Sequence, residues 1–290
     1  MDFQSIALPT ELRYRRYCGC KYRTIFILSK TKEEKNQSLS LRLNQAKMLL
    51  AIDIGNTKIK AAVFEGSGIV ARYIFEKNEA SQNIEHIFRS HPELSQTIVS
   101  SVGKDDNELL FMVREKTGLT LISHESAFPF TNRYVTPATL GIDRMVLAAG
   151  AVLEYPGKNR LVIDAGTCIT YDFVDSGDNY LGGAISPGVK MRYDAMHTFT
   201  AKLPLLYPEM PQHYIGDSTK SAMDSGAVNG TVYEIDGFIE HYLEQYHEVT
   251  IILTGGDADF LAKRLKNTIF ANSNFLLESL NHLYQYTIKQ

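Results

Sequence analysis

An internal repeat constrains the fold of this chain more than any other feature of its sequence. An apolar segment beginning at Leu49 ends in an acidic glycine turn, and two further strand-like segments follow it; the same order begins again at Leu161. Asp53 of the first turn corresponds to Asp164 of the second, 111 residues further on, and in both turns a glycine follows two positions later. A single Asp-x-Gly turn is typical of a tight structural turn as well as of a ligand site. Two copies in the same context predict a duplicated supersecondary unit. The predicted strands are 49–54, 59–63 and 70–75 in the first copy and 161–163, 169–174 and 180–185 in the second.

Each turn carries the residue types that a phosphate loop needs. Glycine lets the backbone approach a phosphate closely, while backbone N–H groups and a threonine hydroxyl donate to its oxygens. An aspartate at the strand end can hold a cation. Thr57 corresponds to Thr167 only if the first turn holds one extra residue, Asn56. Two such hairpins facing each other would bind one nucleoside triphosphate. The glycine patterns of Walker and Rossmann loops are absent from the sequence.

Composition excludes several other classes of protein. The chain has 290 residues, of which 44% are apolar and 22% charged, and this apolar fraction excludes low-complexity disorder. The apolar runs are only as long as strands, so we expect no bilayer-spanning segment. Three scattered cysteines are too few for a disulfide framework and indicate a reducing compartment, so we expect a cytoplasmic protein.

Charge separates a basic N-terminal extension, residues 1–47, from an acidic body. The extension has ten Lys/Arg against four Asp/Glu, whereas the rest has twenty against twenty-nine, which argues against nucleic-acid binding by the body. Basic and aromatic residues alternate in 13–23 as in a nucleic-acid arm, and Cys18 with Cys20 suggests a metal site, although no second Cys/His pair follows nearby. Because Met48 directly precedes the first strand, we expect an extension that is either non-native or disordered.

Seven short motifs resemble, in their order, those of type III pantothenate kinases. They run from Met48 almost to the C-terminus and are Asp53–Thr57, Tyr134–Pro137, Gly141–Arg144, Asp164–Thr167, Gly182–Gly188, Ser218–Ala222 and Thr254–Ala258. The resemblance implies an α/β fold of two ribonuclease-H-like halves, as in actin-like ATPases and in acetate and sugar kinases, around an ATP site. We assign residues 48–153 to the first half and 154–290 to the second.

The resemblance also implies the activity, which is ATP-dependent phosphorylation of pantothenate to 4′-phosphopantothenate, the first step of coenzyme A biosynthesis. By the same resemblance the enzyme is a homodimer with its active site at the subunit interface. It requires Mg²⁺ or a similar divalent ion and a monovalent cation, K⁺ or NH₄⁺. Another small-molecule kinase of the same fold and a non-catalytic nucleotide-binding regulator are the alternatives.

Several residues receive substrate-binding or catalytic roles from this resemblance. Asp143 would be the general base, and Arg144 has a planar guanidinium that suits the pantothenate carboxylate. Both precede an apolar, alanine-rich segment, which predicts the N-terminus of a helix. A helix-capping aspartate beside a surface arginine is the structural alternative. The predicted substrate-binding residues are Tyr134, Gly141, Ile142, Asp143, Arg144 and Thr219.

The nucleotide and cation sites follow from the two hairpins. Asp53 would organise Mg²⁺ through water, and Asp164 matches the family's ligand for the monovalent cation. Of the two lysines Lys58 and Lys60, at least one could be solvated rather than functional. The predicted ATP-binding residues are Asp53, Ile54, Gly55, Asn56, Thr57, Lys58, Ile59, Lys60 and Thr167.

The remaining features are less diagnostic. The motifs 182–188 and 254–258 place adjacent glycines where adenine could lie against the backbone, although plain turns explain them equally well. Cys168 is expected to be a small core residue. Residues 275–286 have the pattern of an amphipathic helix that packs on the second half.

Overall fold

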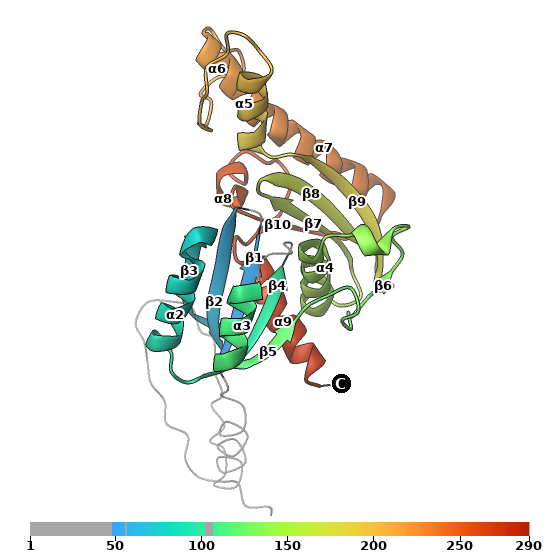
Figure 1. Cartoon of the computed structure of the whole chain (residues 1–290). Helices are drawn as coiled ribbons and strands as arrows, with labels where there is room; N and C mark the ends of the chain where they lie inside the picture. Colours follow the sequence, from blue (N-terminus) through green and yellow to red (C-terminus); the bar gives the residue numbers. More distant parts are fainter. Residues whose placement is uncertain (1–47, 56, 102–106, 290) are drawn as a thin grey trace, which may run out of the picture. The chain divides into compact units, whose positions relative to one another are not determined.

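Figure 1 shows the computed structural model, which describes residues 48–55, 57–101 and 107–289. The predicted extension 1–47, including its two cysteines, lies outside the described residues, as does Asn56. The strands are β1 (Met48–Ile54), β2 (Lys58–Glu65), β3 (Gly68–Glu76), β4 (Leu94–Ser101), β5 (Gly118–Leu121), β6 (Thr131–Asn132), β7 (Asn159–Ala165), β8 (Cys168–Val174), β9 (Asn179–Pro187), β10 (Val249–Thr254) and β11 (Phe270–Ala271). All six predicted strands are therefore present.

The helices alternate with these strands. They are α2 (Ala80–Ser90), α3 (Asn107–Lys116), α4 (Ile142–Glu154), α5 (Val189–Thr198), α6 (Thr219–Asp224), α7 (Gly230–Gln245), α8 (Ala258–Leu261) and α9 (Phe275–Thr287), with the 3-10 turns η1 (Lys77–Glu79) and η2 (Pro137–Thr139) and the π-helical stretch η3 (Ser225–Asn229). The stretch η3 joins α6 to α7.

The two sheets have the same strand order. The first is β3-β2-β1-β4-β5. The second, read in the same direction, is β6-β9-β8-β7-β10-β11, so that β9, β8, β7, β10 and β11 correspond to β3, β2, β1, β4 and β5. In each sheet the first three strands of the repeat are antiparallel neighbours, and the next two strands pair parallel beside them. The second sheet adds only β6, which pairs with β9. The predicted duplication is confirmed at the level of topology.

The turns of the two repeats differ by one residue. In the first turn the amide of Gly55 donates to the carbonyl of Lys58 at 3.1 Å, three positions ahead. In the second the amide of Gly166 donates to the carbonyl of Cys168 at 3.0 Å, two positions ahead. The first turn is therefore one residue longer than the second, as predicted. In the sequence the additional residue is Asn56, between Gly55 and Thr57.

Helices and sheets form alternating layers (Figure 1). Helices α2 and α3 pack on one face of the first sheet, where Leu50, Ile52 and Ile54 point. Helices α4 and α9 fill the space between the sheets and contact Leu49 of one and Val162 of the other. Helix α7 packs on the far face of the second sheet. Because successive side chains of a strand point to opposite faces, the continuous apolar runs of β1 and β7 reflect burial on both sides.

The expectation that the C-terminal helix packs on the second half is wrong. Helix α9 lies against α4 and the inner face of the first sheet, where its leucines meet Ala51 and Phe64. The two helices approach closely, since a Cβ on Gly150 of α4 would lie 1.9 Å from Ser279 Oγ of α9. The helix crosses over because α2 and α3 cover only one face of the first sheet, and its other apolar face needs a partner.

The two halves therefore exchange elements around the predicted division between residues 153 and 154. Strand β6 precedes this division in the sequence and pairs with the second sheet, whereas α9 follows it and packs on the first. Within the described residues, no helix has both the length and the apolar character needed to span a membrane.

Candidate active site

Acidic side chains from both halves gather where the central strands of the two sheets end. Asp53 precedes the last residue of β1 and is 6% exposed, and its Oδ1 accepts a hydrogen bond from Ser100 of β4 at 2.9 Å. Burial raises the pKa of Asp53 to about 6 and that of Asp164, at the end of β7, to about 7. The charge of Lys60 lowers both pKa values, and that of Asp143 raises both. These four groups, predicted separately from the sequence, thus share one electrostatic environment.

Helix α4 presents Asp143 in its first turn. The N-cap is Gly141, so the alternative in which Asp143 is the capping residue is wrong. The Oδ1 atom of Asp143 instead accepts the amide N–H of Arg144 at 2.9 Å. A Cβ on Gly141 would lie 2.4 Å from that Oδ1 atom, so glycine is needed for the aspartate to take this position. The helix N-terminus also favours negative charge here.

Arg144 is not an ordinary surface arginine. It is 6% exposed, and both its Nε and Nη2 contact Oδ1 of Asp172, at 2.8 and 2.7 Å. The hydroxyl of Tyr180 donates to the same oxygen at 2.6 Å. Burial by itself would lower the pKa of Arg144, but the hydrogen bonds and the charge of Asp172 hold it above its ordinary value. Arg144 therefore connects α4 to β8 through a buried ion pair.

Tyr134 lies beside this pair. Its ring centroid is 5.8 Å from the Arg144 guanidinium carbon, within the range of a cation–π contact. A Cβ on Gly182, whose φ is +102°, would lie 3.1 Å from the same ring. Gly182 of β9 thus lies beneath Tyr134, and the tyrosine ring occupies the space that the sequence suggested for adenine. A Cβ on Gly183 would instead lie 1.6 Å from the carbonyl oxygen of Tyr171 on the neighbouring strand β8.

The other glycine motifs surround the second hairpin. The amide of Gly188 donates to the carbonyl of Thr167 at 3.1 Å, and a Cβ there would lie 2.1 Å from the carbonyl oxygen of Gly166. A Cβ on Gly255, whose φ is +98°, would lie 2.4 Å from Asp164 Oδ1, and the amide of Asp257 donates to the carbonyl of Ala165 at 2.9 Å. The motif 254–258 is therefore packed directly behind the second loop, which supports its assignment to the nucleotide side.

The lysines of the first hairpin have different environments. Lys58 is exposed and lies 3.6 Å from Glu76, whereas Lys60 acts on the two buried aspartates. Ile54 and Ile59 are buried in the core, so only their backbone could reach a nucleotide. Thr57 and Thr167 are exposed at the two turns.

Thr219 is not brought to the other substrate residues within the chain. It is the first residue of α6, exposed, and preceded by the N-cap Ser218, whose Oγ accepts from the amide of Ser221 in a capping box. In Figure 1 α6 lies at the far end of the second half from α4.

Three residues of the site were missed in the sequence, namely Ser100, Asp172 and Tyr180. Asp172 could have been noticed in the sequence, because it is an aspartate in the otherwise mostly apolar strand 169–174. In the structure it is fully buried and faces α4. Ser100 and Tyr180 gave no such signal in the sequence, because serine and tyrosine are common at such positions.

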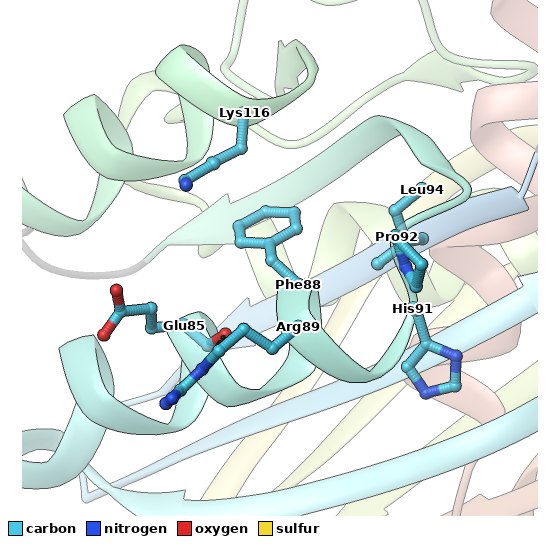
Figure 2. Close-up of a pocket in the computed structure, with 7 residues that line it drawn as sticks. All are labelled: Glu85, Phe88, Arg89, His91, Pro92, Leu94 and Lys116. Carbon is cyan, nitrogen blue, oxygen red and sulfur yellow. Dashed lines mark hydrogen bonds between the residues drawn. The ribbon is translucent and has the colours of Figure 1, made fainter.

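A cavity elsewhere on the first half is separate from this site (Figure 2). It has a volume of about 270 Å³ and lies where α2 and α3 end and β4 begins, with Phe88 and Lys116 pointing into it. Leu94, which lines it, is six residues from Ser100 along β4, or about 20 Å at strand spacing. It therefore opens at the opposite end of the sheet from the aspartates.

The donor set fits hard cations with oxygen ligands. Asp53 and Asp164 are carboxylates whose raised pKa values show that nearby positive charge does not compensate their burial. Among the described residues no three His, Cys, Asp or Glu side chains form a ready metal cluster. Phosphate oxygens and water would complete the coordination shell of any ion held here.

Comparison with known proteins identifies the family and the fold. Residues 49–241 match the family model of type III pantothenate kinases. A type III pantothenate kinase from Flavobacterium johnsoniae is 59% identical over 241 residues, which is 83% of this chain and 99% of the relative. One from Bacteroides fragilis strain YCH46 is 40% identical over 242 residues, with coverages of 82% and 98%. A solved structure of a Baf family protein from Campylobacter jejuni has a TM-score of 0.56 at 19% identity and covers 83% of this chain and 100% of that one, which shows a shared fold.

The duplicated sheets and the carboxylates between them place the chain in the expected fold class, that of actin-like ATPases and sugar kinases. Within that class the chain belongs to the type III pantothenate kinases. It is a kinase of coenzyme A biosynthesis, as the sequence motifs predicted.

Proposed function

We propose that Asp143 is the general base in the transfer of the γ-phosphoryl group from ATP to the 4′-hydroxyl of pantothenate. The carboxylate accepts the hydroxyl proton as the oxygen attacks phosphorus, and the bond from phosphorus to the ADP oxygen breaks in line. The observation that supports this proposal is the position of Asp143 in the first turn of α4, where its charge raises the pKa of both Asp53 and Asp164. Phosphoryl transfer depends mainly on positioning and charge stabilisation, so a correctly positioned carboxylate suffices as the base.

The two hairpins hold the phosphates in this proposal. Backbone amides of the turns at Gly55 and Gly166 donate to phosphate oxygens, together with the hydroxyls of Thr57 and Thr167. Lys60 supplies positive charge near Asp53 and Asp164, which is supported by its lowering of the pKa of both aspartates. Asn56 belongs to the same loop by the family resemblance and lies outside the described residues.

Two cation sites complete the nucleotide side. Asp53 would hold Mg²⁺ through water, and Asp164 would hold K⁺ or NH₄⁺. When bound, such ions neutralise the charge that develops on the phosphoryl oxygens. Asp53 and Asp164 fit this role because their burial leaves them in need of a counter-charge.

Pantothenate would lie along the N-terminus of α4. Gly141 and Ile142 offer backbone contacts there, while Arg144 and Tyr134 would contact its carboxylate end. Thr219 would reach the substrate from a second copy of the chain, in a homodimer of a cytoplasmic enzyme. The half that carries Thr219 supports this with large exposed apolar side chains on β9, the 199–218 loop and α7, which are Leu181, Ile185, Phe199, Leu205, Tyr207, Tyr214, Ile215 and Tyr233.

The test is a coupled kinase assay with pantothenate, ATP, Mg²⁺ and K⁺. Asp143→Asn should lower kcat by at least about a hundredfold, the usual contribution of a general base, while ATP still binds. Asp194→Asn removes a carboxylate paired with Lys190 on the surface of α5 and should leave kcat unchanged. Wild-type turnover in Asp143→Asn would exclude Asp143 from this role.

A further inference from the structure

Asp172 is an aspartate in the interior of the protein, on the face of β8 that packs against α4. Its side chain is fully buried, and burial raises its pKa even though Arg144 opposes the shift. A buried carboxylate is strongly unfavourable unless a counter-charge and hydrogen bonds compensate it. The compensation here comes from Arg144 and from the hydroxyl of Tyr180.

Stability alone gives little reason for such a pair. Replacing a buried ion pair by well-packed apolar residues is often neutral or stabilising. The surrounding layer is apolar, since Val174 of the same strand and Val146 and Leu147 of α4 belong to one core cluster. A charged pair inside an apolar layer therefore indicates a requirement for the orientation of Arg144.

The contacts fix which edge of the guanidinium is used. Asp172 Oδ1 takes the Nε hydrogen at 2.8 Å and an Nη2 hydrogen at 2.7 Å. A guanidinium has five N–H donors in a planar fork. Its other edge, formed by Nη1 and the second Nη2 hydrogen, also presents two parallel N–H donors and can bind a carboxylate in bidentate fashion. Asp172 thus occupies one side of Arg144 and leaves the forked end to another acceptor.

Neighbouring residues restrict the guanidinium further. Tyr180 anchors Asp172 Oδ1 from β9 at 2.6 Å. The Tyr134 ring lies 5.8 Å from the guanidinium carbon and rests over Gly182. The plane of Arg144 is therefore held on one edge by Asp172 and on one face by Tyr134.

We propose that Asp172 is a positioning residue that orients the forked end of Arg144 toward the carboxylate of pantothenate, and that it thereby sets the preference for an acid over a neutral analogue. This inference rests on the proposed function. Because Asp172 offsets the charge of Arg144, recognition depends on directed donors rather than on a net positive pocket. An enzyme with an acidic body can bind an anionic substrate in this way.

The test compares pantothenate with pantothenol, in which a primary alcohol replaces the carboxylate. In Asp172→Asn the KM for pantothenate should rise about tenfold, the equivalent of one charge-assisted hydrogen bond, while the KM for ATP stays within about twofold. The ratio of kcat/KM for pantothenate to that for pantothenol should fall toward the ratio in Arg144→Gln. Tyr180→Phe keeps the ring, removes one hydrogen bond and should change the ratio in the same direction by less.

Asp236→Asn is the matched control, because Asp236 is also buried and accepts hydrogen bonds from Lys266 and Asn267 on another side of the second half. It should not alter the preference for acid over alcohol. An unchanged ratio in both Asp172→Asn and Tyr180→Phe, a lowered KM for pantothenate, or an equal change in the control would overturn the inference. If the wild type transfers no phosphate to pantothenate, the proposed function fails; calorimetric binding of pantothenate then tests Asp172, and equal affinities of wild type and variant reject it.

Discussion

In the first hairpin the residue paired across the strands with Asp53 is Lys60, whereas in the second hairpin the residue paired with Asp164 is Thr170. The paired strands of the two hairpins correspond, apart from the one-residue difference in their turns. Only the first hairpin has a positively charged side chain paired with its aspartate. Burial raises the pKa of both aspartates, and Lys60 lowers both. The hydrogen bond from Ser100 also lowers the pKa of Asp53, which is about 6, whereas the charges of Asp143, Asp53 and Asp172 raise that of Asp164, which is about 7. The second hairpin therefore depends more on a bound ion to keep its carboxylate charged.

A second difference lies two residues further along each returning strand. Ala62 of β2 and Asp172 of β8 occupy equivalent positions, since each pairs with the residue two before the hairpin aspartate. Ala62 belongs to the apolar layer between the sheets, while Asp172 in the same layer pairs with Arg144. The duplicated scaffold thus accepts either packing or polar recognition at one position, according to the side chains that α4 and α9 present there.

The largest effect that would test this comparison is on activity. Asp53→Asn and Asp164→Asn should each lower kcat/KM by at least about a hundredfold, because each removes a charge that organises ions around the transferring phosphate. Activity measured during titration of each variant with Mg²⁺ and with K⁺ distinguishes the roles of the two hairpins. Asp53→Asn should change mainly the Mg²⁺ dependence, and Asp164→Asn mainly the K⁺ dependence. Identical changes in both titrations would show that the hairpins do not divide the two ions.

Gly188→Ala should damage the second hairpin selectively. The new Cβ would lie 2.1 Å from the carbonyl oxygen of Gly166 and 2.5 Å from that of Thr167, so the loop must shift. We expect a loss of about 1–3 kcal/mol in the free energy of unfolding, together with a raised KM for ATP. Urea denaturation and steady-state kinetics measure the two effects. Gly237→Ala in α7 is the control, because open space surrounds its Cβ position, and a similar loss there would refute the steric explanation.

The stability of the cation-free protein should fall as pH rises from about 4 to about 7. Both aspartates have folded-state pKa values above the ordinary aspartate value of 3.8, so in this range the folded state binds more protons than the unfolded state. The slope is at most about 1.4 kcal/mol per pH unit for each group. Urea denaturation at several pH values checks it. Asp164→Asn should flatten the curve mainly near pH 6–7, and saturating cations should flatten it in the wild type; a rise in stability over this range would contradict the raised pKa values.

The smallest expected effect distinguishes the two turn glycines. A Cβ on Gly55 would lie 3.0 Å from the carbonyl oxygen of Lys58, whereas a Cβ on Gly166 would lie 3.9 Å from the carbonyl oxygen of Cys168. Gly55→Ala should therefore be the less stable variant, by about 1 kcal/mol. Thermal denaturation of both variants in parallel measures the difference. Equal stabilities would mean that the longer first turn relaxes to accommodate the methyl group.

Much of the fold was predictable because the repeat is local. Alternation within each strand and a glycine two positions after each aspartate identify both hairpins without any knowledge of tertiary structure. The position of α9 was not predictable, since an amphipathic helix shows that it has an apolar face but not which sheet covers it. The family motifs identified Asp143 and Arg144. The partner of Arg144 was missed because Asp172 is 28 residues away in sequence, and only the packing of α4 on β8 brings the two together.

Helix α9 has a consequence for the order of events during synthesis. The strands of the first sheet emerge from the ribosome well before the helix that covers their inner face, because that helix comes from residues 275–287 and follows every described strand of both sheets. At elongation rates of about 5–20 residues per second, that apolar surface stays bare for roughly ten seconds or longer. A nascent first half is then a substrate for chaperones. A chain on a ribosome stalled shortly before residue 275 would have α4 but not α9, and so could not complete the layer between the sheets.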